Sequence, residues 1–256
     1  MATSFVSPSI WFEGFRPKKT ALLRLFCFPP AGGNAFSFSS WERILPSAVE
    51  IFPVQLPGRG GRLGEEPFRR LMPLVQVLSQ ELLPFLDRPY VLFGHSMGAL
   101  IAFELARHFE RLAKDPALLI LSGRRSAEWP RSKPTTFDLP DEEFKDALRD
   151  MNGTPEEVLN NSQLMELTMP MLRADFELVQ TYHFEGPCNL RCPIRVYGGL
   201  GDTSVVVESL KAWRQYTRNS FSLSMFPGDH FFVFQRSSGV LQKLAMDLES
   251  LMAVRV

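Results

Sequence analysis

The sequence predicts a single α/β domain, residues 1–256, in which a mostly parallel sheet is covered by helices on both faces. Apolar runs alternate with segments of helical spacing in the order β-α-β-α-β-α-β over residues 22–122, a pattern typical of parallel sheets. The alternation breaks over residues 128–182 and resumes at residue 193. A chain of 256 residues is long enough for one large core and requires no second domain.

The elements follow from apolar runs that glycine and proline interrupt. Strands are expected at residues 22–28, 49–55, 89–93, 117–122, 193–199 and 221–226. Helices are expected at residues 36–45, 71–86, 99–110, 205–216 and 235–251. Residues 1–20 have no such pattern and are expected to form a loosely held leader.

The third strand runs into Gly94-His95-Ser96-Met97-Gly98, a G-x-S-x-G motif that is followed at once by a helix. A strand, a sharp turn and a helix form the context in which this motif lifts a serine hydroxyl out of a sheet. The motif alone is weak evidence, and a glycine-rich turn without chemistry is the alternative. The context makes Ser96 the candidate nucleophile.

A loop rich in proline and glycine, residues 29–34, follows the first strand. Such a loop exposes backbone N–H groups, which an oxyanion hole requires, and the residue after the nucleophile supplies the second donor. Ala31 and Met97 are therefore the candidate oxyanion donors. An ordinary strand-to-helix turn is an equal alternative for the loop itself.

Arg59 and Arg62 lie in the loop that follows the second strand, at the same sheet edge as Ser96 if the strands are parallel. They could hold an anionic group. The favoured alternative is that they pair with nearby acids such as Glu65 and Glu66.

Residues 128–182 contain helix-like pieces that prolines and glycine separate. The pieces are expected at residues 141–151, 155–159, 162–168 and 171–182. Helices inserted between two core strands over the carboxyl edge would form a lid that shapes a pocket and excludes water. Met169, with Met165 and Met171, would suit an adaptable apolar wall. The alternative is that these helices only cover the sheet.

Asp202 and His230 each follow a late strand. With Ser96 they occur in the chain order Ser, Asp, His that is expected of an α/β-hydrolase fold. His230 would act as the general base, and Asp202 would orient its imidazole and stabilise the imidazolium. Esterases, lipases, thioesterases and acyltransferases share this chemistry, so the triad does not select the substrate.

The composition excludes several classes of protein. The formal net charge is zero, with 28 basic and 28 acidic residues, so nothing favours nucleic acid or an anionic membrane as a partner. No apolar stretch reaches the roughly 20 residues of a membrane span, and a soluble, cytoplasmic protein is expected. The three cysteines lack the ligand set of a structural zinc site, so they are interpreted as reduced thiols and no metal is expected.

Several stretches together resemble the type II thioesterases that accompany polyketide and nonribosomal peptide synthases. They are FCFPPAGGNAFSF, VQLPGRGGR, VLFGHSMGALIAFELA, MPMLRADFELVQTY, VYGGLGDTSV and FPGDHFF. The resemblance runs from about Leu22 to Phe234, and the combination is more specific than any single stretch. The chain departs from the pattern at Pro30, where many members have histidine.

The resemblance implies hydrolysis of acyl groups from the phosphopantetheine thiol of acyl or peptidyl carrier proteins, which removes misprimed units. It implies the triad and oxyanion donors already named and no cofactor beyond the phosphopantetheine of the substrate. A monomer is expected. It also places Arg173, Asp175 and Phe176, with Ala174, on a lid helix near the substrate chamber. Basic side chains at the entrance would steer an acidic carrier. The candidates for this docking role are Arg59, Arg62, Arg124, Arg125 and Lys133. A general carboxylesterase and an acyltransferase are the rival functions.

Overall fold

A computed structural model of the chain describes residues 10–131 and 134–253. Within these ranges, six strands form one sheet in the order β2-β1-β3-β4-β5-β6, and every neighbouring pair is parallel. The strands are β1 Leu23–Phe28, β2 Val49–Pro53, β3 Tyr90–His95, β4 Leu118–Ser122, β5 Ile194–Gly199 and β6 Phe221–Phe226. The expected α/β architecture is confirmed, and each predicted strand ends within two residues of the observed one.

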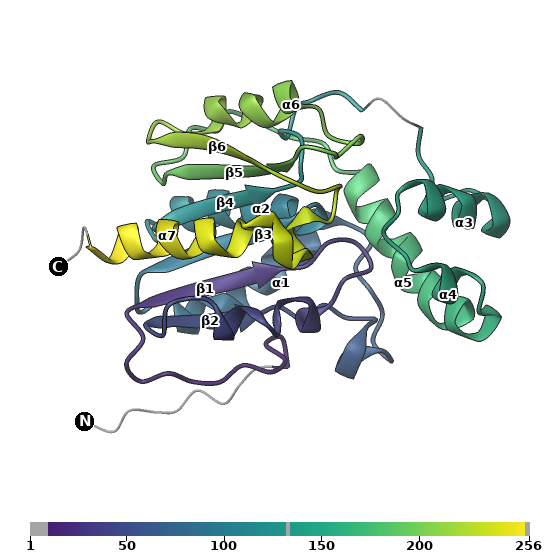
Figure 1. Cartoon of the computed structure of the whole chain (residues 1–256), viewed down its shortest axis with the longest axis horizontal. Helices are drawn as coiled ribbons and strands as arrows, with labels where there is room; N and C mark the ends of the chain where they lie inside the picture. Colours follow the sequence, from purple (N-terminus) through teal and green to yellow (C-terminus); the bar gives the residue numbers. More distant parts are fainter. Residues whose placement is uncertain (1–9, 132–133, 254–256) are drawn as a thin grey trace.

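Helices cover both faces of the sheet (Figure 1). The helices are α1 Leu71–Leu82, α2 Met97–Arg111, α3 Asp141–Asp150, α4 Glu156–Leu159, α5 Ser162–Gln180, α6 Val207–Lys211 and α7 Val240–Ala253. Helices α1, α2 and α6 pack in one apolar cluster with one face of the sheet, whereas α7 packs in a second cluster with the other face. Because both faces are covered, the central strands are mostly apolar, and β3 and β4 are buried at every position, including the polar His95 and Ser122 at their carboxyl ends.

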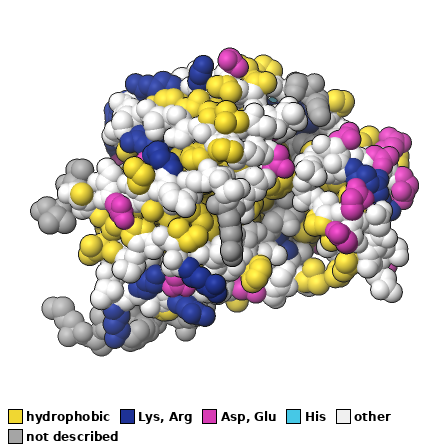
Figure 2. All heavy atoms as spheres, viewed as in Figure 1, with side chains coloured by type: hydrophobic (Ala, Val, Ile, Leu, Met, Phe, Trp, Pro, Cys, Tyr) yellow, Lys and Arg dark blue, Asp and Glu magenta, His cyan; other side chains and the backbone are white. Residues whose placement is uncertain are grey.

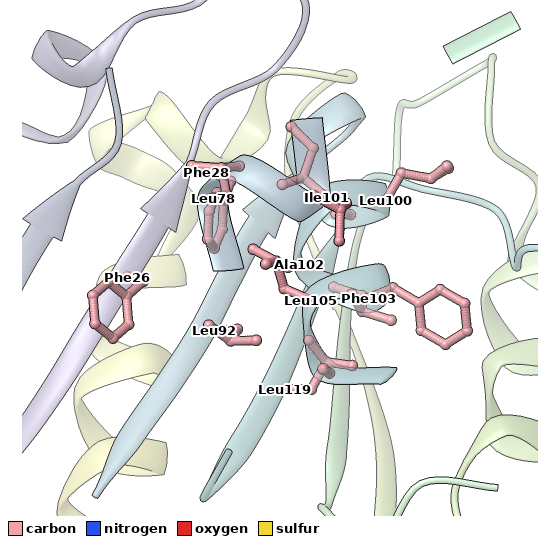
Figure 3. Close-up of a cluster of buried hydrophobic side chains, with 14 of the residues drawn as sticks. Phe26, Phe28, Leu78, Leu92, Leu100, Ile101, Ala102, Phe103, Leu105 and Leu119 are labelled. Atoms are coloured by element: carbon pink, nitrogen blue, oxygen red, sulfur yellow. The ribbon is translucent and has the colours of Figure 1, made fainter. Parts of the chain in front are cut away.

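The packing around α2 fixes the position of the turn between β3 and the first residue of α2, Met97. Side chains of this helix interlock with α1 and with strands β1, β3 and β4 in a cluster that includes Phe28, Leu92 and Ile101 (Figure 3). All of these side chains have no exposed surface. A close-packed interior of this kind resists displacement. The turn between β3 and α2 is therefore held on a rigid base.

The segment at residues 10–20 differs from the expected loose leader. Trp11 and Phe12 are buried in the core, and Phe12 contacts Phe52 and Phe85 edge to face. The guanidinium of Arg62 lies 3.9 Å from the centroid of the Trp11 ring. Two aromatic side chains supply enough apolar area to order a segment that has no periodic pattern. Residues 1–9 lie outside the described ranges.

Helices α3, α4 and α5 form an insertion between β4 and β5, which we call the helical insertion. It lies beyond the carboxyl ends of the strands (Figure 1) and has a small apolar cluster of its own, including Phe144, Leu148 and Met165. Two separate helices were expected at residues 162–168 and 171–182, and this prediction is wrong, because α5 is continuous through Pro170. The carbonyl that loses its donor belongs to Glu166, which is exposed, so water can satisfy it.

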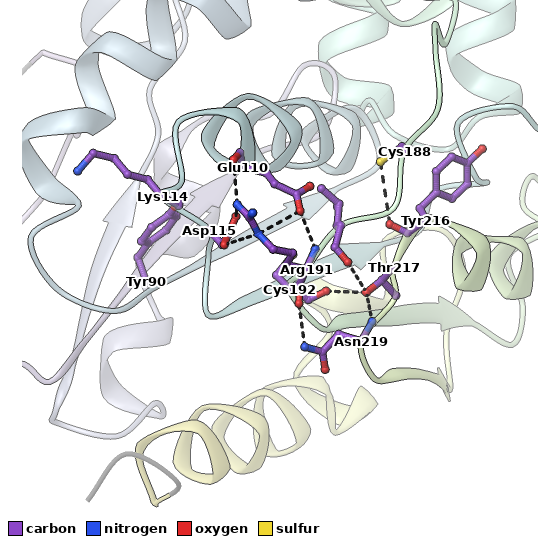
Figure 4. A network of polar contacts seen from close by, with 11 residues as sticks. Tyr90, Glu110, Lys114, Asp115, Cys188, Arg191, Cys192, Tyr216, Thr217 and Asn219 are labelled. Atoms are coloured by element: carbon purple, nitrogen blue, oxygen red, sulfur yellow. Dashed lines mark hydrogen bonds and ion pairs between the residues drawn. The ribbon is translucent and has the colours of Figure 1, made fainter.

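The opposite, amino edge of the sheet is closed by polar contacts (Figure 4). Arg191 forms ion pairs with Asp115 and Glu110, and the Thr217 hydroxyl donates to the carbonyl of Cys192 at 2.7 Å. Cys27, Cys188 and Cys192 are free thiols, as expected, and burial raises the pKa of Cys188 to about 11. No helix in the two described ranges is long and apolar enough to span a bilayer.

Candidate active site

Ser96 occupies a strained turn between β3 and α2. Its backbone has φ 52° and ψ −109°, a conformation that residues with a side chain rarely adopt. The glycines of the motif are required by close contacts. A Cβ atom on Gly94 would lie 2.0 Å from the Gly98 carbonyl oxygen, and one on Gly98 would lie 2.1 Å from the Phe28 carbonyl oxygen. The two glycines therefore permit the tight turn that presents the serine.

The three predicted catalytic side chains meet at the carboxyl edge of the sheet. His230 Nε2 lies 3.0 Å from Ser96 Oγ, and His230 Nδ1 lies 2.7 Å from Asp202 Oδ2. Ser96 follows β3, Asp202 follows β5 and His230 follows β6, and these strands belong to one side of the sheet order. Parallel strands bring their carboxyl ends together, so residues 134 positions apart become neighbours.

Ser204, which was not among the predicted site residues, completes the surroundings of Asp202. Its backbone N–H and its hydroxyl donate to Asp202 Oδ1 at 2.8 and 2.6 Å. Burial opposes ionisation of Asp202, but the hydrogen bonds from His230 and Ser204 outweigh it and lower the pKa of the carboxyl. A serine two positions after an aspartate is typical of an Asx turn, and this signal was available in the sequence.

His95 is fully buried behind His230, and their ring centroids are 5.2 Å apart. Its Nδ1 lies 3.0 Å from the Ser122 hydroxyl, whereas its Nε2 has no hydrogen-bond partner among the described residues. Burial, assisted by the neighbouring His230, lowers the pKa of His95 well below its ordinary value. His95 is therefore neutral, so it adds no positive charge beside an imidazolium at His230.

The two candidate oxyanion donors belong to segments that flank the serine turn closely. Met97 is the first residue of α2, where a backbone N–H has no acceptor within the helix. Ala31 is in the loop after β1, and the Cβ clash at Gly98 shows how closely that strand end approaches the turn. In the described part of the chain, neither the Ala31 N–H nor the Met97 N–H has a hydrogen-bond acceptor. Both groups are available to an oxyanion.

Arg59 and Arg62 were candidates for carrier docking, and the structure contradicts that role. Their side chains are only 4% and 7% exposed. Arg62 pairs with Glu65, the alternative that the sequence favoured, and Arg59 pairs with Asp175 on α5. A side chain that is buried and paired on both sides of its guanidinium cannot contact the surface of a partner protein.

The other residues predicted near the chamber have structural contacts. Arg173 pairs with Asp141 and lies over the ring of Phe144, and Phe176 packs edge to face on the same ring. Met169 is half-buried against the small cluster of the helical insertion. Asp175, also predicted near the chamber, binds the loop of Ala31 by accepting a hydrogen bond from the Gly32 N–H.

Two of the remaining docking candidates are half-buried, and the third is not described. Arg124 and Arg125 lie just after β4, and burial together with their mutual repulsion lowers the pKa of Arg124 to about 9. Lys133 falls outside the described residues. In those residues, no group of three or more His, Cys, Asp or Glu side chains could hold a metal ion.

Comparison with known proteins adds an independent line of evidence. The family model of the thioesterase domain matches residues 23–248. The gramicidin S biosynthesis protein GrsT of Aneurinibacillus migulanus is 39% identical over 247 residues, which cover 96% of each chain.

Two solved structures are similar in fold and sequence. The thioesterase RedJ from the prodiginine pathway of Streptomyces coelicolor has a TM-score of 0.83 at 35% identity, and the match covers 88% of this chain and 90% of RedJ. The type II thioesterase BorB from the borrelidin biosynthetic cluster has a TM-score of 0.85 at 33% identity, covering 94% and 98%. With its sheet order, its serine turn and this extent of similarity, the chain is a member of the thioesterase domain family, with the α/β-hydrolase fold and the activity of a thioester hydrolase.

Proposed function

We propose that this enzyme hydrolyses acyl groups from the phosphopantetheine thiol of acyl or peptidyl carrier domains in polyketide or nonribosomal peptide biosynthesis. The observation that carries the chemistry is the continuous hydrogen-bonded series from Ser96 Oγ through His230 to Asp202, at 3.0 and 2.7 Å. The biosynthetic names of GrsT, RedJ and BorB support the substrate class. Removal of aberrant or misprimed units is the physiological role that follows.

The mechanism begins with attack of Ser96 on the thioester carbonyl while His230 Nε2 accepts the serine proton. The negative charge that develops on the carbonyl oxygen is stabilised by the N–H groups of Met97 and Ala31. Collapse of the tetrahedral intermediate breaks the C–S bond, and the imidazolium of His230 returns its proton to the departing thiolate. Asp202 stabilises that imidazolium and fixes its tautomer.

Water then repeats the sequence on the acyl-serine. His230 takes a proton from the water as it attacks the ester carbonyl, and the same two N–H groups hold the oxyanion. His230 then protonates Ser96 Oγ as the carboxylic acid leaves. The helical insertion lies over this edge of the sheet, and we assign it the role of a lid that covers the acyl chain.

The surface charge limits where a carrier domain can dock. Acidic side chains gather over the helical insertion (Figure 2). Those exposed on α3 and α4 are Asp141, Glu142, Glu143, Asp146, Asp150, Glu156 and Glu157. This face would repel a carrier of the usual acidic character. We therefore place docking on another face, with the enzyme acting as a cytoplasmic monomer.

The test presents one acyl group in three forms, on a carrier domain, on a pantetheine thiol and as an oxygen ester, to the wild type and to Ser96→Ala. We expect the carrier-bound thioester to have the highest kcat/KM and Ser96→Ala to be inactive on all three. Faster turnover of the oxygen ester would indicate a general carboxylesterase. Adding an alcohol or amine acceptor tests the remaining rival, since an acylated acceptor in place of the free acid would indicate an acyltransferase.

A further inference from the structure

We propose that Arg59 and Asp175 are positioning residues for the oxyanion loop, residues 29–34, and that helix α5 acts through them to hold the Ala31 N–H in its catalytic direction. The inference rests on the proposed function, because it concerns the rate at which Ser96 is acylated. Neither residue touches the reacting atoms. Their effect passes through the backbone of the loop.

The ion pair between Arg59 and Asp175 is bidentate and buried. Arg59 Nη1 and Nη2 donate to Asp175 Oδ2 and Oδ1, both at 2.7 Å, and the two side chains are 4% and 2% exposed. Removing two charges from water costs free energy that their attraction returns only in part, so a buried pair is weak evidence for a stabilising role. The pair joins α5 to the loop after β2, 116 residues away in the chain. A role in positioning accounts for its retention in the interior.

The same two side chains bind successive groups of the oxyanion loop. Asp175 Oδ2 accepts a hydrogen bond from the Gly32 N–H at 2.8 Å, and Arg59 Nη1 donates to the Gly33 carbonyl at 3.1 Å. The Gly32 N–H belongs to the peptide that follows Ala31, and the Gly33 N–H donates to the Pro30 carbonyl, which shares a peptide plane with the Ala31 N–H. Holding Gly32 and Gly33 therefore restrains the peptides on both sides of Ala31, and with them the direction of the Ala31 N–H. Arg59 also neutralises the Asp175 carboxylate, which accepts from the Gly32 N–H. Without Arg59, that negative charge would oppose an oxyanion bound to the N–H of the preceding residue, Ala31.

Two further contacts prevent the loop from relaxing. Gln55 accepts from the Ala35 N–H at 2.9 Å and donates to the Arg59 carbonyl at 2.6 Å, so the pair and the loop share one buried network. Gly32 has φ +73°, and a Cβ atom there would lie 2.8 Å from Leu172 of α5. Helix α5 therefore both binds the loop and packs against it.

The first experiment compares Asp175→Ala and Asp175→Asn with a matched control on the same helix, Glu177→Gln. Glu177 forms ion pairs with the exposed Arg69 and Arg70, and within residues 10–131 and 134–253 no hydrogen bond or ion pair joins it to the oxyanion loop. Steady-state hydrolysis of an acyl-pantetheine thioester is measured for each. We expect Asp175→Ala to lower kcat about 10- to 100-fold, because a misplaced donor costs less than a lost one, with KM within about threefold of wild type.

Asp175→Asn keeps an oxygen acceptor for the Gly32 N–H, so its kcat should lie between those of Asp175→Ala and the wild type. Glu177→Gln should stay within about twofold of wild type, since exposed ion pairs contribute little. An unchanged kcat in Asp175→Ala would overturn the inference. So would an equal loss in Glu177→Gln, because the effect would then belong to the helix in general.

A second readout separates positioning from general damage to the site. An alkyl boronic acid binds Ser96 as a tetrahedral adduct and uses the oxyanion donors, whereas an acyl-pantetheine thioether analogue with no electrophilic carbonyl does not. In Asp175→Ala we expect the boronic acid to bind about 10- to 100-fold more weakly, in proportion to kcat/KM, and the thioether to bind within about threefold. Equal weakening of both ligands would refute the positioning role.

Asp175→Ala leaves Arg59 buried without its partner and could fail to fold. A second variant without either charge therefore tests the same loss of the Gly32 acceptor. Arg59→Met combined with Asp175→Leu removes both charges and keeps apolar volume. We expect this variant to fold and to show the same loss in kcat, because the Gly32 N–H still lacks its acceptor. Recovery of wild-type kcat would overturn the inference. Failure of the wild type to cleave the thioester would instead refute the proposed function.

Discussion

Replacing Gly98 with alanine is expected to displace an oxyanion donor. The new Cβ would lie 2.1 Å from the carbonyl oxygen of Phe28, 2.6 Å from its carbonyl carbon and 2.8 Å from the carbonyl oxygen of Pro29. These are backbone atoms, and one of them must move by about 0.9 Å to restore a 3.0 Å contact. Strand β1 is held between β2 and β3, so it cannot retreat.

The strain must then be relieved in the loop that carries Ala31 or in the first turn of α2 that carries Met97. A displacement of about 1 Å at a catalytic group costs on the order of 100-fold in rate. We therefore expect kcat of Gly98→Ala to fall about 100-fold. The overpacked contact should also lower the free energy of unfolding by about 1–3 kcal/mol.

Hydrolysis of an acyl-pantetheine thioester gives kcat and KM, and urea unfolding gives the change in stability. Gly64→Ala is the matched control, because no heavy atom other than those of Gly64 and its two chain neighbours lies within 4 Å of a Cβ built there. It should leave both quantities near wild type. A Gly98→Ala enzyme with kcat within threefold of wild type and unaltered stability would show that this approach of backbone to backbone does not fix the oxyanion donors.

Three further predictions concern the residues around the nucleophile. Ser96→Gly should abolish hydrolysis. It should also raise the free energy of unfolding, measured by urea titration, by about 1 kcal/mol, because glycine relieves the strain at positive φ. A less stable variant would contradict the assigned strain. Between pH 7.5 and 5.0, the wild type should lose about 2 kcal/mol more unfolding free energy than His95→Gln. The lowered pKa of His95 means that only its unfolded form takes up a proton as the pH falls below about 6.5. Ser204→Ala should lower kcat about tenfold with little change in KM, because Asp202 loses one charge-assisted hydrogen bond; a change below twofold would assign no role to that hydroxyl.

The strands and the meeting of Ser96, Asp202 and His230 could be predicted because the signals are local. Apolar runs bounded by glycine or proline mark the strands, and parallel strands place their carboxyl ends together wherever they fall in the chain. Each of the three residues follows a strand directly or within a few positions. The sheet therefore brings the side chains together without any pattern that links them in the sequence.

The helix boundaries were predicted from local sequence rules, and tertiary packing overrides those rules in this fold. Proline removes one hydrogen bond from a helix, and the rule that it ends the helix assumes that the loss matters. In α5 the loss falls on an exposed carbonyl at Glu166, whereas Met171 and Leu172 beyond Pro170 are buried, so packing maintains the helix. The expected helix at residues 36–45 is instead two short 3₁₀ segments, Ala35–Phe38 and Trp41–Arg43.

The pairing of Arg59 with Asp175 could not be predicted, because nothing local marks one partner for the other. The docking hypothesis assumed that basic side chains at the entrance would be exposed to an acidic carrier, because arginine is mostly found at the surface. Only the folded chain shows that α5 covers this loop and removes the side chain from water. The burial of Trp11 was missed for a similar reason, since its contacts lie in distant segments.

The 134 positions between Ser96 and its base have a consequence for how activity arises during folding. A chain that has formed β1 to β4 already holds the serine turn, but the acid follows β5 and the base follows β6 at the edge of the sheet. Partly folded chains would therefore possess a nucleophile that nothing deprotonates. Turnover would begin only when the last strand docks. Release of product would then also report completion of the sheet, and an unfinished enzyme would leave its thioester substrate untouched.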